Sequence, residues 1–141
     1  MNTKKVINIL KNIFNHELAG VIRYTHYSLM IFGQNRLPLV QFFRAQAKES
    51  LMHAETAGEY ITGLDGHPPL NIENIKETFK HDVHDILKET LQHEEKAIES
   101  YYTLLDQVKD ESVFLEEFAR TMIGQEELHV LEVKKMLKKN E

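Results

Sequence analysis

The sequence predicts an all-α protein, and three observations carry the prediction. Helix breakers are sparse, with only three prolines in 141 residues, so long helices are permitted. Good helix formers (Ala, Leu, Glu, Lys and Gln) fill the chain, and no stretch alternates as a strand does. Apolar residues recur at helical period in four blocks, over roughly residues 3–32, 39–64, 82–108 and 112–138.

Connection lengths choose the topology. The first two blocks are joined by the short GQNRLP and the last two by the short KDE, which suits antiparallel neighbours. Residues 63–81 between the second and third blocks are too many for a tight hairpin, and we expect a short extra helical turn at 71–79. This long crossover lets the second and third helices run parallel, which predicts a four-helix bundle with one crossover.

Length and composition bound the function. The chain has the size of one domain, which we assign to residues 1–141. Its net charge of -5 gives no general attraction to nucleic acid or anionic membranes. No apolar run approaches the roughly 18 residues of a membrane span, and Asn and Lys interrupt the N-terminal apolar residues. The absence of Cys excludes disulfides and thiolate sites. We expect a cytoplasmic protein without nucleic-acid or membrane partners.

Carboxylates and imidazoles interrupt the apolar faces of all four blocks. Glu17 lies in the middle of the apolar face of the first block, and Glu94 does so in the third. The stripe of the second block contains a Glu and a His, and so does that of the fourth. These two pairs are Glu49 with His53 and Glu126 with His129.

The two halves of the chain repeat this arrangement. A tyrosine follows each lone glutamate after seven residues, as Tyr24 follows Glu17. The separation from the lone glutamate to the histidine of the next block is 36 residues in the first half and 35 in the second. The spacing indicates a pseudo-repeat of two helical hairpins. It also favours Glu94 over its neighbour His93 as the inward residue of the third block.

Such groups need a compensating partner, because each unpaired ion in a core costs several kcal/mol. Two divalent cations would balance four carboxylates, and oxygen and nitrogen donors without sulfur favour iron, with manganese possible, over a structural zinc. One Glu from each of two helices and a Glu–His pair from each of the others is the pattern of di-iron carboxylate bundles. The predicted metal ligands, which are also the predicted catalytic residues, are Glu17, Glu49, His53, Glu94, Glu126 and His129.

Over nearly the whole chain the sequence resembles the bacterioferritins of the ferritin-like superfamily. The resemblance runs from VINILKNIFNHELAGVIRY to QEELHVLEVKKML and is most specific at NHEL, at His53-Ala-Glu and at QEELH. It implies a ferritin-like four-helix bundle in which Tyr24 lies beside the metal centre without binding metal itself. It further implies terminal carboxylate ligands at Glu17 and Glu94, nitrogen ligands at His53 and His129, and a bridging carboxylate at Glu126.

The resemblance also implies a function. It implies oxidation of Fe(II) to Fe(III) with O2 or H2O2 at a dinuclear centre within one chain, for iron storage or detoxification, in a homo-oligomer of at least two chains. An alternative is a di-iron or di-manganese oxidase or peroxide-scavenging protein without storage. A Dps-like or purely structural bundle is less favoured, because the Dps family builds its iron site between subunits and often carries a basic tail.

The second block departs from the family pattern. The family's Glu precedes the His by three residues, where this chain has Ser50, and Glu49 lies one residue earlier. On a regular helix Glu49 lies roughly 40° from the direction of His53, against roughly 60° at the normal spacing. We expect a local π-bulge between Glu49 and His53 to bring both to the metals. Alternatively, Glu49 is solvated and Ser50 replaces a lost bridging ligand.

Two further departures concern haem and assembly. Leu51 stands where the family has its haem-binding Met, and the adjacent Met52 is rotated by roughly 100°, which argues against haem. The sequence ends just after the fourth block, so we expect the family's fifth helix to be missing, and the choice between a dimer and a closed cage stays open.

The remaining histidines receive simpler interpretations. We expect His67 to lie in a loop, and His16 and His26 to be ordinary surface or hydrogen-bonded histidines. The segment HDVHD, residues 81–85, is expected to begin the third helix, with its aspartates complementing the helix dipole, rather than to bind a second metal.

Overall fold

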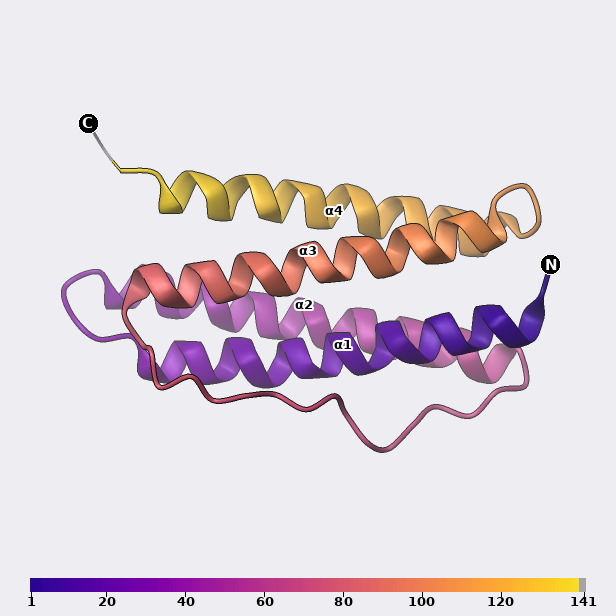
Figure 1. The fold of residues 1–141 in the computed structure, drawn as a ribbon, viewed down its shortest axis with the longest axis horizontal. Helices are drawn as coiled ribbons and strands as arrows, with labels where there is room; N and C mark the ends of the chain where they lie inside the picture. The colour runs from indigo at the N-terminus through magenta and orange to yellow at the C-terminus, as the bar shows by residue number, and fades with distance from the viewer. Residues whose placement is uncertain (140–141) are drawn as a thin grey trace.

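Four helices make up the computed structural model, which describes residues 1–139 (Figure 1). The prediction of an all-α fold is confirmed, and the helix ends lie within a few residues of the expected positions. The helices are α1 (Thr3–Met30), α2 (Arg36–Gly63), α3 (Val83–Val108) and α4 (Val113–Leu137). The described residues contain no fifth helix.

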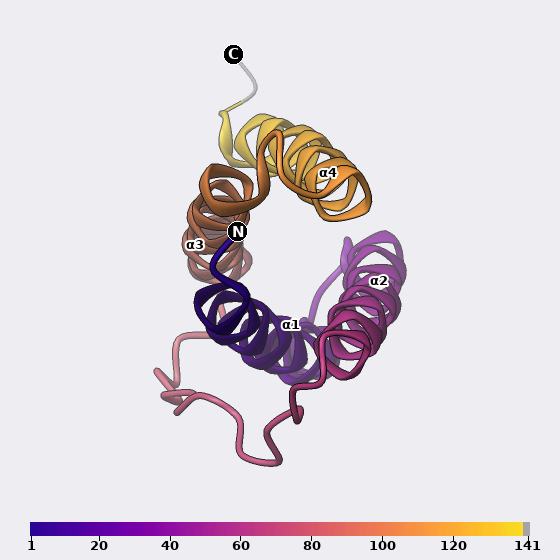
Figure 2. The same ribbon diagram turned by 90° about the vertical axis from the view of Figure 1, so that its right-hand side faces the viewer.

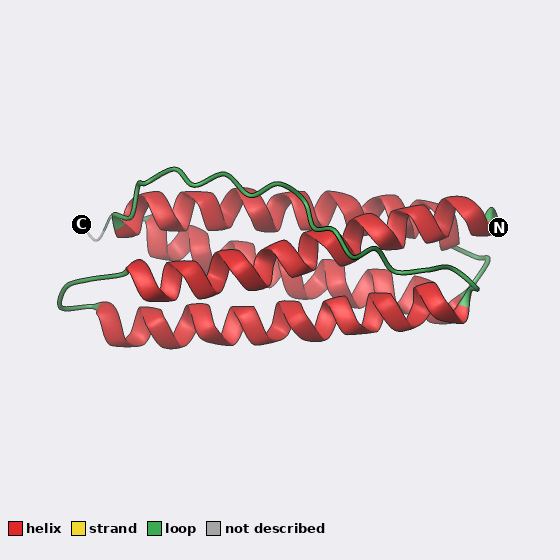
Figure 3. Ribbon diagram, turned by 90° about the horizontal axis from the view of Figure 1, so that it is seen from below, coloured by secondary structure: helices red, strands yellow, loops and turns green. Residues whose placement is uncertain are grey.

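The connection between α2 and α3 determines the topology. Residues 64–82 travel back along the bundle, so that α2 and α3 run in the same direction, whereas α1 with α2 and α3 with α4 form antiparallel hairpins (Figures 1 and 3). We call residues 64–82 the crossover. The predicted bundle with one long crossover is therefore confirmed.

The short helix predicted at residues 71–79 is wrong, because the described crossover contains no helix (Figure 3). Phe79 adopts a positive φ of 57°, which interrupts a right-handed helix. Its backbone N–H donates to the side chain of Glu77 at 2.8 Å instead of to a helical carbonyl. Local side-chain bonding of this kind competes with helix formation.

Of the four pairs of adjacent helices in the bundle, three are in close backbone contact. Helix α1 packs against α2 and α3, and α3 packs against α4, whereas no Cα atom of α2 lies within 8 Å of one in α4 over the described residues. The end view shows this wider side of the bundle (Figure 2). Near one end, Tyr60 of α2 bridges it by edge contacts with Phe114 and Phe118 of α4, at ring-centroid distances of 5.2 and 5.1 Å.

Buried apolar side chains form two clusters rather than one continuous core. The first occupies the half of the bundle near the α3–α4 turn and includes Leu10, Ile61, Leu104 and Leu115. The second occupies the other half and includes Tyr24, Phe43, Ile86 and Val133. On every helix the residues between the two clusters include buried polar groups, and we call this zone the polar layer.

No helix in the described part of the chain is both long and apolar enough to cross a membrane.

Candidate metal centre

Within the polar layer, one buried ionisable side chain from each helix belongs to a shared cluster. Their ligand atoms approach one another in two overlapping groups. These side chains are Glu17 on α1, His53 on α2, Glu94 on α3 and Glu126 on α4. His129, one turn beyond Glu126, completes the layer at its edge with a side chain that is 20% exposed.

These residues form two groups that share one carboxylate. Within Glu17, His53 and Glu126, and within Glu94, Glu126 and His129, ligand atoms lie within 4.8 Å of one another. The two oxygens of Glu126 divide between the groups. Its Oε1 lies 4.0 Å from Nδ1 of His53, and its Oε2 lies 3.8 Å from Nδ1 of His129. Glu126 is thus the carboxylate that the two groups share.

In the first group, Glu17 and His53 are directly paired. Nδ1 of His53 lies 2.7 Å from Oε2 of Glu17, a short charge-assisted contact. Burial raises the pKa of Glu17 to about 7, although the interaction with His53 opposes this shift. Burial lowers the pKa of His53, but Glu17, followed by Glu126 and Glu49, more than offsets this, so the net pKa is raised. Without metal, the pair therefore retains a proton near neutral pH.

In the second group, Glu94 is the most strongly perturbed carboxylate. Burial, followed by the charge of Glu126, raises the pKa of Glu94 to about 8. Its Oε1 accepts a 3.3 Å hydrogen bond from the hydroxyl of Tyr24, while its Oε2 is buried without a hydrogen-bond partner. The Glu126 carboxylate raises the pKa of His129 to about 9, and Nδ1 of His129 is also buried without a partner.

The unpartnered Oε2 of Glu94 and Nδ1 of His129 indicate whether the residues of the polar layer suit metal ions. A buried carboxylate oxygen and a buried imidazole nitrogen without partners are costly features of a folded chain. Both lie in the group around Glu126, where a cation would coordinate them. The donor set of carboxylates and imidazoles without sulfur suits iron or manganese. The polar layer therefore fits two divalent cations.

His93 is buried in the polar layer but belongs to neither group that contains Glu126, although it directly precedes Glu94. Its ring stacks on that of His16 at a centroid distance of 3.8 Å, and burial lowers its pKa to about 2. Nε2 of His16 donates to the backbone oxygen of His93 at 2.8 Å, and Nδ1 of His16 lies 3.3 Å from Glu73. His16 is thus a buried, hydrogen-bonded histidine. The structure brings Glu94, not His93, close to Glu126.

Comparison with protein families decides the classification. The family of ferritins, described as a ferritin-like domain, matches residues 7–141. The chain belongs to the ferritin-like family. None of the curated proteins matches its sequence.

Solved structures of ferritin-like proteins share the fold closely. A ferritin-like diiron-carboxylate protein from Bacillus anthracis superposes with a TM-score of 0.91 at 26% identity, covering 96% of this chain and 97% of that one. A dodecameric thioferritin from Bacteroides fragilis, described as bacterioferritin-related, gives 0.88 at 20% identity, covering 97% and 86%. Bacterioferritin from Desulfovibrio desulfuricans gives 0.86 at 22% identity, covering 96% and 79%. A Dps protein from Vibrio cholerae also has this fold.

This ferritin-like chain keeps a regular helix where the π-bulge was predicted, and that prediction is wrong. Residues 36–63 are α-helical throughout. Glu49 and Ser50 consequently point to different neighbours. Ser50 is buried against α1, where its Oγ would lie 2.7 Å from a Cβ added to Gly20. Glu49 is 44% exposed and belongs to neither group, but its Oε2 lies 3.2 Å from Nε2 of His129.

Helix regularity explains this placement of Glu49. Its side chain extends across the wide side of the bundle toward α4, and the helix has no extra residue that would rotate it further inward. Glu49 is therefore placed to contact a ligand, and its own coordination of metal stays a prediction. Leu51 and Met52 are both exposed, and the expectation that haem is not bound also stays a prediction.

The two repeated tyrosines differ in their bonding. Tyr24 of α1 donates to Glu94 of α3, whereas the buried hydroxyl of Tyr101 has no hydrogen-bond partner. Burial and nearby carboxylates, Glu94 for Tyr24 and Glu17 for Tyr101, raise the pKa of both phenols well above the ordinary value. The sequence spacing had associated Tyr24 with Glu17, on its own helix. The observed bond depends on the packing of α1 against α3, which the spacing does not define.

Proposed function

We propose that this ferritin-like protein binds two Fe(II) ions per chain in the polar layer and oxidises them to Fe(III) with O2 or H2O2, in iron storage or detoxification. The observation that supports this proposal is the position of Glu126. Its two oxygens face two separate donor groups, each completed by another Glu and a His of the same chain. One carboxylate can therefore hold two metal ions close together.

Each ligand has a defined role in the proposal. Glu17 with His53 holds one Fe(II), and Glu94 with His129 holds the other, while Glu126 bridges them. The protons now retained by these groups leave as the cations bind, so uptake is favoured by rising pH. Two Fe(II) together supply the two electrons that convert O2 and two protons to H2O2, or H2O2 and two protons to two waters.

The edge of the layer at His129 supplies the access route. His129 and Glu49 are the most exposed of the six predicted residues, with 20% and 44% of their side chains accessible, whereas Glu17 is buried. A carboxylate at the solvent boundary attracts cations. We assign Glu49 the role of receiving Fe(II) and orienting His129, and this edge the role of admitting the oxidant.

The cellular setting extends the same proposal. A bacterioferritin-related relative is described as a dodecamer, which supports a homo-oligomer for this chain, and we place it in the cytoplasm. The complete donor set within one chain favours the bacterioferritin-like arrangement over a Dps-like site shared between subunits. Retention of Fe(III) by a closed shell would support storage. A dimer that turns over and retains little would instead support oxidation alone.

Anaerobic titration with Fe(II), followed by addition of O2, tests the proposal. We expect saturation near two Fe(II) per chain and rapid oxidation, with both lost in Glu126→Gln. Glu127→Gln is the matched control, because Glu127 is the exposed neighbour on the same helix, and it should match the original protein. Unchanged binding in Glu126→Gln would refute the shared site. Parallel titration with Mn(II) distinguishes a manganese protein.

A further inference from the structure

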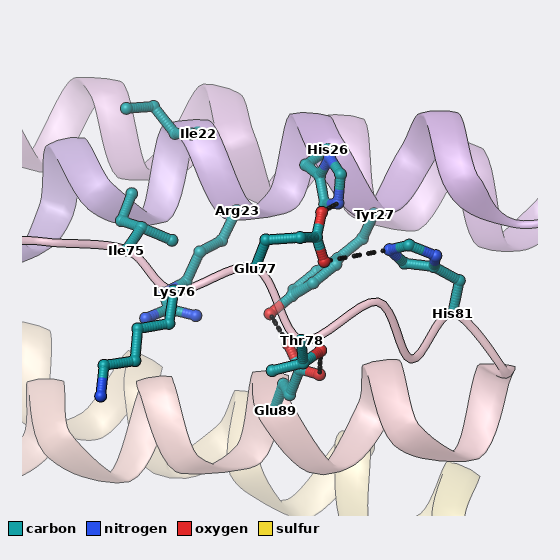
Figure 4. Close-up of a pocket in the computed structure, with 10 residues that line it drawn as sticks. All are labelled: Ile22, Arg23, His26, Tyr27, Ile75, Lys76, Glu77, Thr78, His81 and Glu89. Atoms are coloured by element: carbon teal, nitrogen blue, oxygen red, sulfur yellow. Dashed lines mark hydrogen bonds and ion pairs between the residues drawn. The ribbon is translucent and has the colours of Figure 1, made fainter.

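A second convergence of histidines lies on the outer face of the bundle, where the crossover passes over α1 (Figure 4). His26 comes from α1, and Glu77 and His81 come from the crossover. We propose that these three residues form a second metal site, for a zinc-type divalent transition-metal ion, that fastens the crossover to α1. The site shares no residue with the polar layer and does not depend on the function proposed for it.

The three side chains already approach the geometry of coordination. Nε2 of His26 lies 2.9 Å from Oε2 of Glu77, and Nε2 of His81 lies 3.3 Å from Oε1. One ligand atom from each residue lies within 4.8 Å of the others. Ligand bonds of 2.0–2.1 Å in a tetrahedron place neighbouring donors about 3.3 Å apart. Only a small contraction of the cluster is therefore needed, with water as a fourth ligand.

Ion pairing between the histidines and Glu77 leaves both imidazole nitrogens without a hydrogen bond. Nε2 of His26 and Nε2 of His81 are both shielded from solvent, yet neither makes a hydrogen bond of acceptable geometry to Glu77. A surface pair between one His and one Glu contributes little to stability and gives no reason for a second imidazole to converge. A cation between the three groups would use both nitrogens and the carboxylate at once.

The backbone around Glu77 holds this arrangement in place. Phe79, between Glu77 and His81, adopts the left-handed conformation that L-residues rarely occupy, and this turn directs His81 back toward Glu77. The N–H of Phe79 donates at 2.8 Å to Oε1 of Glu77, the same oxygen that faces His81. A ligand carboxylate oriented by its own hydrogen bond is a common feature of metal sites, and unusual backbone conformations concentrate at ligand clamps.

A metal here would reinforce a lightly anchored segment. Next to the cluster, Thr78 of the crossover donates to Glu89 of α3 at 2.8 Å, and Glu89 also accepts from Tyr27 of α1 at 3.0 Å (Figure 4). Further along, Glu73 contacts His16. In sequence, Glu77 and His81 of the cluster lie on either side of Thr78, and His81 lies just before the start of α3. Coordination would therefore close the crossover over α1 with bonds stronger than these hydrogen bonds.

Calorimetric titration of the metal-free full chain with Zn2+ tests the inference. The original protein should bind one Zn2+ per chain more than His26→Ala, His81→Ala or Glu77→Gln. His84→Ala is the matched control, because His84 is an exposed histidine three residues from His81 and outside the cluster, and it should bind as much Zn2+ as the original. Equal Zn2+ stoichiometry in all five proteins would overturn the proposal.

Limited proteolysis measures whether Zn2+ holds the crossover to α1. Saturating Zn2+ should slow cleavage within residues 64–82 several-fold in the original protein and in His84→Ala, and the protection should be lost in His26→Ala and His81→Ala. Far-UV circular dichroism should show the same helix content in every variant, which shows that each is folded. Equal protection by Zn2+ in the His26 and His81 variants would contradict the site.

Discussion

The hydroxyl of Tyr24 on α1 donates a 3.3 Å hydrogen bond to Oε1 of Glu94 on α3. The bond links the two halves of the pseudo-repeat inside the polar layer. It also fixes one oxygen of Glu94 and leaves the other, which is buried without a partner, free to bind a cation.

Replacing Tyr24 by Phe should therefore impair the metal centre while preserving the fold. Loss of a hydrogen bond that orients a ligand typically weakens metal affinity or activity about 10- to 100-fold, and we expect this effect on Fe(II) affinity or oxidation rate. Tyr27→Phe is the control, because the Tyr27 hydroxyl bonds to Glu89 outside the layer. Equal kinetics in all three proteins would contradict an orienting role. Stopped-flow absorbance after mixing with O2 is the measurement.

Substitutions at Glu49 and Ser50 should have unequal effects. Glu49 contacts His129, so Glu49→Gln should weaken binding of one of the two Fe(II) ions and slow its uptake, by a few-fold at an exposed position. Ser50 faces Gly20 of α1, and Ser50→Ala should leave both binding steps unchanged. Anaerobic Fe(II) titration resolves the two steps. A larger loss in Ser50→Ala would instead assign the ligand role to Ser50.

The stability of the metal-free protein should fall as pH rises from 5 to 8. Burial raises the pKa of Glu17 to about 7 and that of Glu94 to about 8, from 4.5, so the folded chain holds protons that the unfolded chain releases. Where the folded state binds more protons, unfolding becomes easier with rising pH, here by on the order of 3 kcal/mol for each group. His129, raised from 6.5 to about 9, acts in the same direction above pH 6.5.

Thermal unfolding at a series of pH values checks this dependence. Glu94→Gln should flatten the slope between pH 5 and 8, because the amide does not titrate. Saturating metal should reverse the trend, since cations replace the protons as pH rises. A melting temperature of the metal-free protein that increases over this range would show that the carboxylates are ionised in the fold.

Gly20 should be among the least replaceable glycines. A Cβ at this position would lie 2.7 Å from Oγ of Ser50 and 2.9 Å from Nε2 of His93, so Gly20→Ala should destabilise the fold by about 1–3 kcal/mol. Gly124, helical and with nothing within 4 Å, is the control. Gly124→Ala should stabilise by about 0.5–1 kcal/mol. Urea unfolding measures both, and equal effects would contradict the close approach of α1 to α2 and α3.

Helical periodicity and connection lengths were sufficient to predict the fold, and periodicity predicted much of the layer. Glu17 and Glu94 interrupt otherwise apolar faces, so the packing that forms the core also turns them inward. The same reasoning placed Glu126 and His129 together, because residues three apart share a helix face. Sequence alone could therefore predict which helices contribute polar groups to the centre of the bundle.

Helical periodicity could not predict the contacts that the crossover makes. Periodicity describes a helix face, and it gives no direction for side chains on an extended segment. His26 and Glu77 are distant in sequence and meet only because the crossover passes over α1. The partner of His93 was unpredictable for a related reason, since its stacking on His16 depends on the packing of α1 against α3.

On the wide side of the bundle, α2 and α4 lack, over the described residues, the close backbone contacts that the other adjacent helices make. Helices α2 and α4 are joined there by Tyr60 with two phenylalanines near one end, and by the groups of the polar layer, including His53 with Glu126 and Glu49 with His129. Cations bound between these ligands would link α2 to α4, which lack close backbone contacts in the described part of the chain. Amide hydrogen exchange should consequently slow most along the centres of α2 and α4 when metal is added, while the seam between α1 and α2 changes little.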